Sequence, residues 1–298
     1  MQNYYVDSSV AASGDGSESS PFKQLSDFFK PRSVSHPITI NIKKGLTYQG
    51  GVIDNNKLLY NTTPAESYIK TYGEGSPPVI VARDIYNERC IRRPKVRNLI
   101  ADPIILAGTM ALNPLGNVNP CMIAGYNDTN VWLNGWDFHA IGGKQQAWNP
   151  AFWFAASNEV LGNAGYFGMN NPKFVDTARG VLVMGINDIP SGIQDNNGDR
   201  YYVYGIRINN PSFVNVGGDG IILSNAASID NPKNHNMDKV IADRNYSGIV
   251  NPAYSSSRSD IQNNASVAFW FSNANRCFFI NRRSMAVLER VMVLISKQ

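Results

Sequence analysis

Short apolar runs, each bounded by Gly, Asn or Pro, are the main pattern along the chain. Apolar side chains alternate at Ile38, Ile40 and Ile42, which predicts a strand with one buried face. Further short strands are expected at residues 4–6, 79–81, 130–138, 202–209 and 266–272. Strands this short, separated by turn residues, are typical of an all-β protein built from many turns.

One stretch, residues 213–225 (FVNVGGDGIILSN), joins two apolar strands through a glycine-rich corner. Weaker copies lie upstream: DFHAIGG at 137–143 repeats the Phe-to-Gly-Gly spacing, and FVDTARGVLVMG at 174–185 aligns if one residue is gapped. The recurrence predicts a solenoid of stacked coils with loops of unequal length. Asn209, Asn210 and Asn225 are expected at bends, where their amides can stack between coils, although Asn is also common in ordinary turns.

The N-terminal segment predicts a short amphipathic helix. Ser20 is the expected N-cap, and Pro21 the expected first helical residue. Phe22, Leu25 and Phe29 would then share one face, which can cover the open apolar end of the first coil.

Four segments carry a family resemblance: YYVDSS, GDGSESSPFKQLSDFF, ITINIKKGLTYQGGVI and SYIKTYGEGSPPVI. They resemble the opening of proteins in the pectin-lyase-like, right-handed parallel β-helix superfamily, which includes bacterial polysaccharide-degrading enzymes and bacteriophage tailspikes. The resemblance is close over residues 4–80 and looser through 281. It implies an all-β, right-handed, single-stranded parallel β-helix with a short N-terminal cap helix.

On this basis the chain divides into an N-terminal strand and cap (1–30), a β-helix (31–284) with long loops near 103–121 and 228–264, and an off-pattern tail (285–298). With permissible codons, the tail can be reread in a shifted frame as GGFGEGYGVDFKA, which is β-helix-like. The fold would then be truncated at its C-terminus. The alternative is that residues 285–295 form a genuine amphipathic cap.

The composition narrows the range of functions that are expected of this chain. The formal charge is only +4 over 298 residues, and no basic run is interleaved with aromatics, so nucleic acid is not an expected partner. The three cysteines are too scattered for a disulfide framework or a zinc site. No secretory signal precedes the first strand, and no apolar run reaches membrane-spanning length.

The resemblance implies action on a polysaccharide, either a bacterial-surface or a plant or algal type of glycan. Hydrolysis needs two carboxylates, whereas elimination from a uronic acid needs a base and a cation that neutralises the substrate carboxylate. A lyase of this kind can use Ca²⁺; no other cofactor is expected. The NTD, DD and GHG/RIK sets of polygalacturonase-like hydrolases and the Asp cluster of calcium-dependent pectate lyases are absent from the sequence, which argues against both of these families. The sequence does not decide between hydrolysis and elimination.

The alternative to an enzyme is a non-catalytic, carbohydrate-binding or structural β-helix, such as a tailspike-like adhesin, or an inactive fragment. A tailspike-like protein would form a homotrimer. Either function would act outside the cell or on a virion.

The candidate catalytic residues are polar side chains at strand ends and corners. Asp137 and His139 flank Phe138, so alternation directs both outward, where a carboxylate and an imidazole can form an acid/base pair. Asp176 and Arg179 occupy a corner related to that of Asp219, and all three are expected near the same outer groove. The plainer alternatives are a solvated surface pair and, for Asp219, a turn residue bonded to its own backbone.

The candidate substrate-binding residues are aromatic or basic and lie in or near loops: Trp148, Trp153, Lys239 and Arg244. Indole rings can stack on the apolar faces of sugar rings. Packing in the core or between coil and loop is the alternative for both tryptophans.

Overall fold

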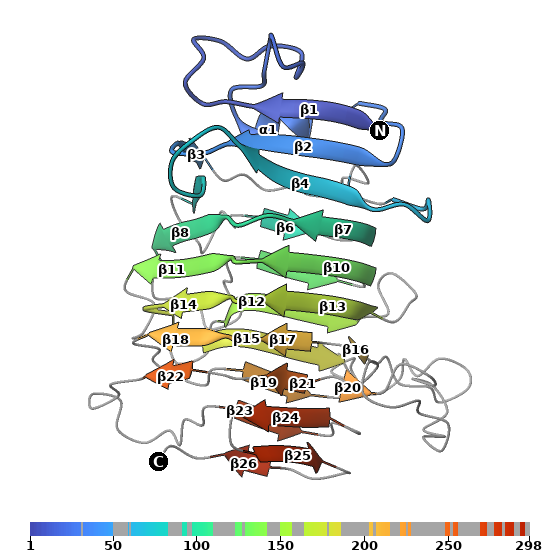
Figure 1. Cartoon of the computed structure of the whole chain (residues 1–298), viewed down its shortest axis with the longest axis vertical. Helices are drawn as coiled ribbons and strands as arrows, with labels where there is room; N and C mark the ends of the chain where they lie inside the picture. The colour runs from blue at the N-terminus through green and yellow to red at the C-terminus, as the bar shows by residue number, and fades with distance from the viewer. Residues whose placement is uncertain are drawn as a thin grey trace, which may run out of the picture.

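The fold is a stack of coils whose strands form three sheets (Figure 1). The computed structural model describes residues 1–30, 32–49, 59, 61–82, 91–93, 97–109, 123–126, 129–141, 150–156, 164–177, 179–185, 203–204, 207–214, 221–224, 226–227, 248–250, 253–255, 269–272, 277–281, 284–288 and 293–295. Figure 1 places the N-terminus at one end of the stack and the last strands at the other.

We name the three sheets A, B and C. Sheet A has 12 strands: β1 (Gln2–Val6), β2 (Ile38–Lys43), β4 (Ser67–Tyr72), β7 (Arg97–Ala101), β10 (Thr129–Asn134), β13 (Ala164–Asn170), β17 (Arg207–Asn209), β21 (Gly248–Val250), β24 (Cys277–Asn281) and β25 (Ser284–Leu288), with β16 (Val203–Tyr204) and β20 (Ala226–Ala227) attached beside β13. Sheet B has 7 strands: β3 (Thr47–Gln49), β5 (Val79–Ala82), β8 (Ile105–Thr109), β11 (Asp137–Ile141), β14 (Lys173–Val175), β18 (Ser212–Val214) and β22 (Ala253–Ser255). Sheet C also has 7 strands: β6 (Ile91–Arg93), β9 (Ile123–Tyr126), β12 (Pro150–Ala156), β15 (Arg179–Gly185), β19 (Ile221–Ser224), β23 (Phe269–Ser272) and β26 (Val293–Ile295).

From β4 to β24 the chain visits the sheets in the order A, B, C and then returns to A one strand further along, whereas β1, β2 and β3 belong to sheets A and B. The described pairings are parallel, except where β25 meets β24 and β26 meets β23. The predicted right-handed parallel β-helix is therefore confirmed.

The register confirms the repeat found in the sequence. Phe138, Phe174 and Phe213 occupy one position in three successive strands of sheet B. In sheet C, Val181 pairs with Ile221, so the offset between the two coils grows by one residue after the phenylalanines. This is the single gap that the alignment required.

Alternation along the strands builds the core. Inward side chains such as Ile40, Leu106 and Phe138 are fully buried, and the stacked rings of Phe138 and Phe174 have centroids 4.9 Å apart. Parallel strands in register place like residues above one another, so each coil extends the same apolar column.

Short corners between sheets A and B carry an asparagine ladder. The Asn209 amide donates to Oδ1 of Asn170 at 2.7 Å, and the Asn170 amide donates to Oδ1 of Asn134 at 2.8 Å. Beside them, Asn210 donates to Asn171 at 3.1 Å, and both residues have positive φ. Amide stacking is thus confirmed for Asn209 and Asn210, whereas Asn225 lies outside the described residues.

The N-terminal end is covered by a helix shorter than expected, α1 (Leu25–Phe28). Its N-cap is Gln24, so the predicted start at Ser20 and Pro21 is wrong. The reason is that residues 16–22 pair with the free edge of β1: Tyr5 N–H donates to Gly16 O at 2.9 Å, and Phe22 N–H donates to Tyr5 O at 2.9 Å. Phe28 is buried in place of the expected Phe29.

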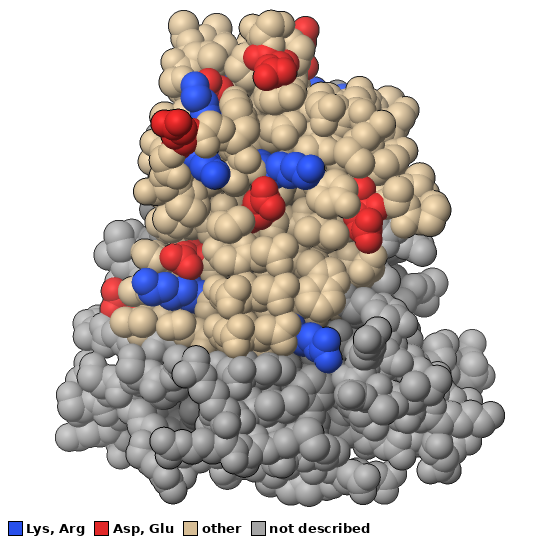
Figure 2. Space-filling view, in the orientation of Figure 1, with Lys and Arg blue, Asp and Glu red and all other residues tan. Residues whose placement is uncertain are grey.

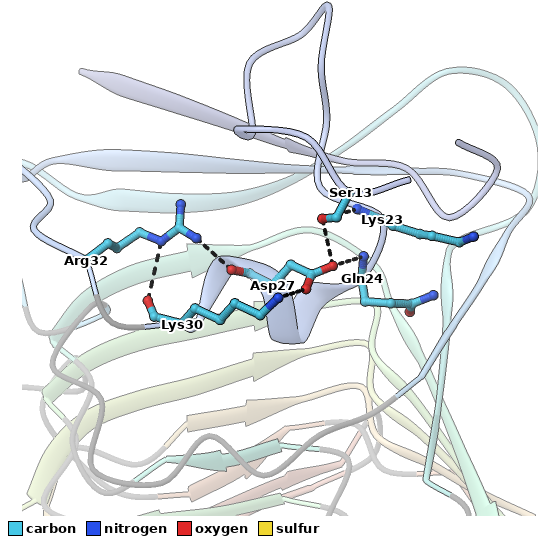
Figure 3. Close-up of polar contacts among 6 residues, drawn as sticks. All are labelled: Ser13, Lys23, Gln24, Asp27, Lys30 and Arg32. Carbon is cyan, nitrogen blue, oxygen red and sulfur yellow. Dashed lines mark hydrogen bonds and ion pairs between the residues drawn. The ribbon is translucent and has the colours of Figure 1, made fainter. Parts of the chain in front are cut away.

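Asp27 makes the polar contacts that connect the residues of this cap (Figure 3). Its carboxylate accepts from the Gln24 backbone at 3.1 Å, from the Ser13 hydroxyl at 2.8 Å and from Lys30 Nζ at 2.6 Å. Arg32 donates to the Asp27 carbonyl at 2.6 Å, and its guanidinium lies 4.3 Å from the ring centroid of Phe22. The cap therefore closes the first coil with both apolar and charged contacts.

Three further sequence predictions need correction. Residues 130–138 were expected as one strand, but Gly135, with φ of 62°, and Trp136 form a corner between β10 and β11. The expected loop at 103–121 contains β8, and the one at 228–264 contains β21 and β22. These strands are hard to recognise in the sequence because each is short and is bounded by Pro and Asn residues at its corners.

Candidate functional site

Strand β11 presents a carboxylate and an imidazole on the outside of sheet B. Phe138 between them is fully buried, whereas the side chains of Asp137 and His139 are 29% and 38% exposed. The predicted outward orientation of both residues is confirmed.

The two side chains contact each other electrostatically. His139 Nε2 lies 3.7 Å from Asp137 Oδ2, which is longer than a hydrogen bond but within ion-pair distance when the imidazole is protonated. Nε2 is buried and makes no hydrogen bond to the described residues. Because Nε2 is buried, a substrate could meet only the exposed part of the imidazole.

The register of the neighbouring strands determines which residues surround Asp137 and His139. Asp137 lies between Ile105 of β8 and Lys173 of β14, and His139 lies between Ala107 and Val175. Burial among these strands raises the pKa of Asp137, and the charges of His139 and Lys173 offset only part of that rise. A carboxyl that holds its proton longer is better suited to act as an acid.

Asp176 and Arg179 lie one coil further on. Val175 pairs with His139, and Asp176 follows it with φ of 54° and its backbone N–H donating to Val214 O at 3.1 Å. Arg179 is the first residue of β15, in sheet C. The structure thus brings Asp137 and His139 together and places Asp176 at the corner after β14. Asp219 lies outside the described residues.

Of the candidate binding residues, Trp153 belongs to β12 in sheet C, level with Ala124 and Leu182. Trp148, Lys239 and Arg244 lie outside the described residues. The roles of all four stay predictions.

Lys173, the basic residue next to Asp137, was not among the site residues predicted from the sequence. A signal for it existed, because aligning Phe138 with Phe174 places Lys173 at the position of Asp137.

In the described ranges, no three or more His, Cys, Asp or Glu residues gather as a metal site. None of the described helical residues form a helix long and apolar enough to span a membrane.

The comparisons with known proteins find a similarity in structure but none in sequence. No protein-family model and no curated protein sequence matches the chain. Among solved structures, the selenomethionine form of the GH136 lacto-N-biosidase from Eubacterium ramulus superposes with a TM-score of 0.50 at 15% identity, covering 93% of this chain and 50% of that one. The native form gives 0.46 at 16% identity, covering 85% and 45%. A rhamnogalacturonan lyase gives 0.36 at 11% identity, covering 93% and 87%.

The superposition on the selenomethionine form supports the parallel β-helix fold. This chain spans about half the length of the lacto-N-biosidase structures.

Proposed function

We propose that this chain acts on a polysaccharide through the outer face of sheet B, as a polysaccharide lyase or a glycoside hydrolase. The observation that carries the proposal is the outward pair Asp137 and His139, 3.7 Å apart, with burial raising the pKa of Asp137. The superposed structures are named as a lacto-N-biosidase and a rhamnogalacturonan lyase, and both names denote the cleavage of carbohydrates.

In elimination, His139 would take the proton next to the carboxylate of a uronic acid. The glycosidic C–O bond then breaks, and the leaving oxygen takes a proton from Asp137. Lys173, which lies beside Asp137, would neutralise the substrate carboxylate and so acidify the proton that is removed. Ca²⁺ is the other cation that could serve this step, and its ligands would have to include residues beyond the described ranges, because no metal cluster lies within them.

In hydrolysis, Asp137 would protonate the leaving oxygen. Asp176, at the corner of the next coil, would be the second carboxylate that activates water or attacks the sugar. The two routes use the same outer face and differ in the product, so they can be separated by assay.

The test is cleavage of a panel of polysaccharides: polygalacturonate, alginate and rhamnogalacturonan for elimination, followed by ultraviolet absorbance, and arabinoxylan and galactan for hydrolysis, followed by reducing ends. Each is assayed with Ca²⁺ and with EDTA. We expect His139→Gln and Asp137→Asn to slow cleavage about 10²- to 10⁴-fold. Glu74→Gln, which removes an exposed carboxylate from the corner between β4 and β5, is the matched control.

Cleavage that survives both substitutions would remove the proposed site. Binding to a glycan without cleavage would instead favour the carbohydrate-binding alternative, as in a tailspike-like adhesin. We place either activity outside the cell or on a virion, and light scattering would test for the homotrimer that a tailspike-like protein forms.

A further inference from the structure

A column of mostly uncharged residues, with a tryptophan at its centre and an arginine at one end, runs along the outside of sheet A, away from the Asp137 and His139 site. Tyr68, Ile100, Trp132, Gly168 and Arg207 occupy one register position in five successive strands. Their neighbours Ile69, Leu99, Val131 and Phe167 are buried in the core, so alternation directs the column outward. We call these five residues the sheet A column.

Gly168, which lies level with Trp132 on the neighbouring strand β13, leaves room for the Trp132 indole on the sheet. A Cβ added to Gly168 would overlap Cε3 and Cζ3 of the Trp132 indole, so the ring occupies the space that a side chain at 168 would fill. Trp132 is half-buried, which fits a ring lying along the sheet with part of its surface in solvent. A glycine at this position therefore allows the indole to lie flat across the next strand.

The chemistry beside the column is polar and, at both ends, basic. The amides of Asn134 and Asn170 lie two residues further along β10 and β13, level with each other. Lys70 Nζ lies 4.9 Å from the ring centroid of Tyr68 at one end, and Arg207 belongs to the column at the other. Figure 2 shows an uncharged area over β7, β10 and β13, with acidic and basic residues above it and a basic residue at its lower edge.

We propose that the sheet A column is a second glycan-binding surface, on which the Trp132 indole stacks against a pyranose ring of an acidic polysaccharide, with Lys70, which lies over the Tyr68 ring, at one end. The chemical class of the ligand rests on the proposed function, whereas the location does not. The axial C–H groups of a pyranose form an apolar face that packs on an aromatic ring, and the sugar hydroxyls then point sideways to amides. Basic residues at both ends of the column favour sugars that carry carboxylates.

The direction of the column suits a polymer. Tyr68 and Trp132 are two strands apart, so their backbones lie about 9.5 Å from each other along the stack. The Trp132 indole reaches further, over Gly168 of the next strand. A glycan that runs from Lys70 to Arg207 would therefore pass over the indole.

The surface is distinct from the proposed cleavage site, because the corner of Gly135 and Trp136 separates β10 from β11 and turns the chain onto another face. A protein that holds a long glycan here would keep the polymer close while sheet B acts on it. Short oligosaccharides would gain nothing from this second surface.

The test is affinity electrophoresis in gels containing polygalacturonate, alginate or arabinoxylan, combined with the cleavage assay. We expect Trp132→Ala to weaken retention by an acidic polymer about 3- to 10-fold, while cleavage of short oligosaccharides stays unchanged. Gly168→Ala should weaken retention in the same direction because its methyl group displaces the indole. Trp132→Tyr should keep most of it, which distinguishes stacking from a folding defect.

Tyr5→Ala is the matched control, since Tyr5 is an outward aromatic residue of β1 that lies outside the column. Wild-type cleavage with retention unchanged in Trp132→Ala would overturn this inference and leave the proposed function standing. Neither cleavage nor retention of any polymer by the wild-type protein would overturn both.

Discussion

Among the individual residues, Asp7 joins the first two strands through its carboxylate. Oδ2 accepts from Lys43 Nζ at 2.7 Å, and Oδ1 accepts from both the backbone and the hydroxyl of Ser9. Burial alone would raise the pKa of Asp7, but the hydrogen bonds from Lys43 and Ser9 and the charge of Lys43 together lower it. The ionised form is therefore part of the folded structure.

We expect Asp7→Asn to lower the free energy of unfolding at neutral pH by about 1.5–3 kcal/mol, the usual value of hydrogen bonds to a charged group. Because the folded pKa is lowered, the contribution of Asp7 is present above its ordinary value of 3.8 and is lost as the pH falls through the folded pKa. The difference between wild type and variant should therefore shrink in acid. Urea unfolding at several pH values measures it, with Glu18→Gln as the control. A constant difference across this range would contradict the assigned role.

Asp137 has the opposite sign, since burial raises its pKa. Its contribution to stability is present below the ordinary value of 3.8 and is lost as the pH rises through the folded pKa. We expect Asp137→Asn to unfold at a slightly higher temperature than wild type at neutral pH, with the gap closing in acid. Thermal unfolding followed by circular dichroism tests this, and a neutral-pH loss of stability would show that the carboxylate is held by its cations. A substitution that raises the stability of a protein while it lowers the activity is typical of residues that serve the reaction and not the fold.

Much of the residue-level pattern was predictable. Alternation around Phe138 was enough to orient Asp137 and His139, because one buried aromatic residue determines the direction of its neighbours in a strand. Lys173 and the sheet A column were missed because they depend on which strands pair, and loops of unequal length between the strands hide that register in the sequence.

Among the elements, the asparagine ladder links successive corners between sheets A and B. Asn170 is its middle member, donating to Asn134 and accepting from Asn209. We expect Asn170→Ala to cost about 1–3 kcal/mol of unfolding free energy, since two amide contacts are lost at once. Chemical denaturation measures it against Asn3→Ala, an exposed residue of β1. Equal stability of the two variants would mean that the ladder contributes no more than a solvated amide.

The elements also show where sequence patterns fail. The β-helix was predictable from recurring Phe and Gly positions, and the single gap between the coils at 174 and 213 was correct. The start of α1 was not, because Ser20 and Pro21 carry a helix-start pattern while the free edge of β1 competes for the same backbone. Strand β8 was missed because Pro103 precedes a run with few polar alternations.

For the whole molecule, the two ends of the stack are closed in different ways. At the N-terminus, residues 16–22 pair with β1 and α1 covers the core. At the other end, β25 pairs with β24 and β26 with β23, both antiparallel (Figure 1). These two strands pair with β24 and β23, so they cover the edges of sheets A and C at this end of the described residues. The division at 285 and the shifted-frame origin of the tail stay predictions, and the codons of the gene decide the second.

Deleting residues 284–298 tests this closing role. The backbone groups of β23 and β24 that now pair with β26 and β25 would be left open, and open strand edges template pairing with another molecule. We expect the shortened protein to keep its β circular-dichroism signal but to elute as dimers and larger species in size-exclusion chromatography with light scattering. Deleting only 296–298 is the control, because it removes chain without removing either strand. A monodisperse shortened protein with an unchanged unfolding midpoint would show that sheets A and C need no cover at this end, and that the antiparallel strands are dispensable to the stack.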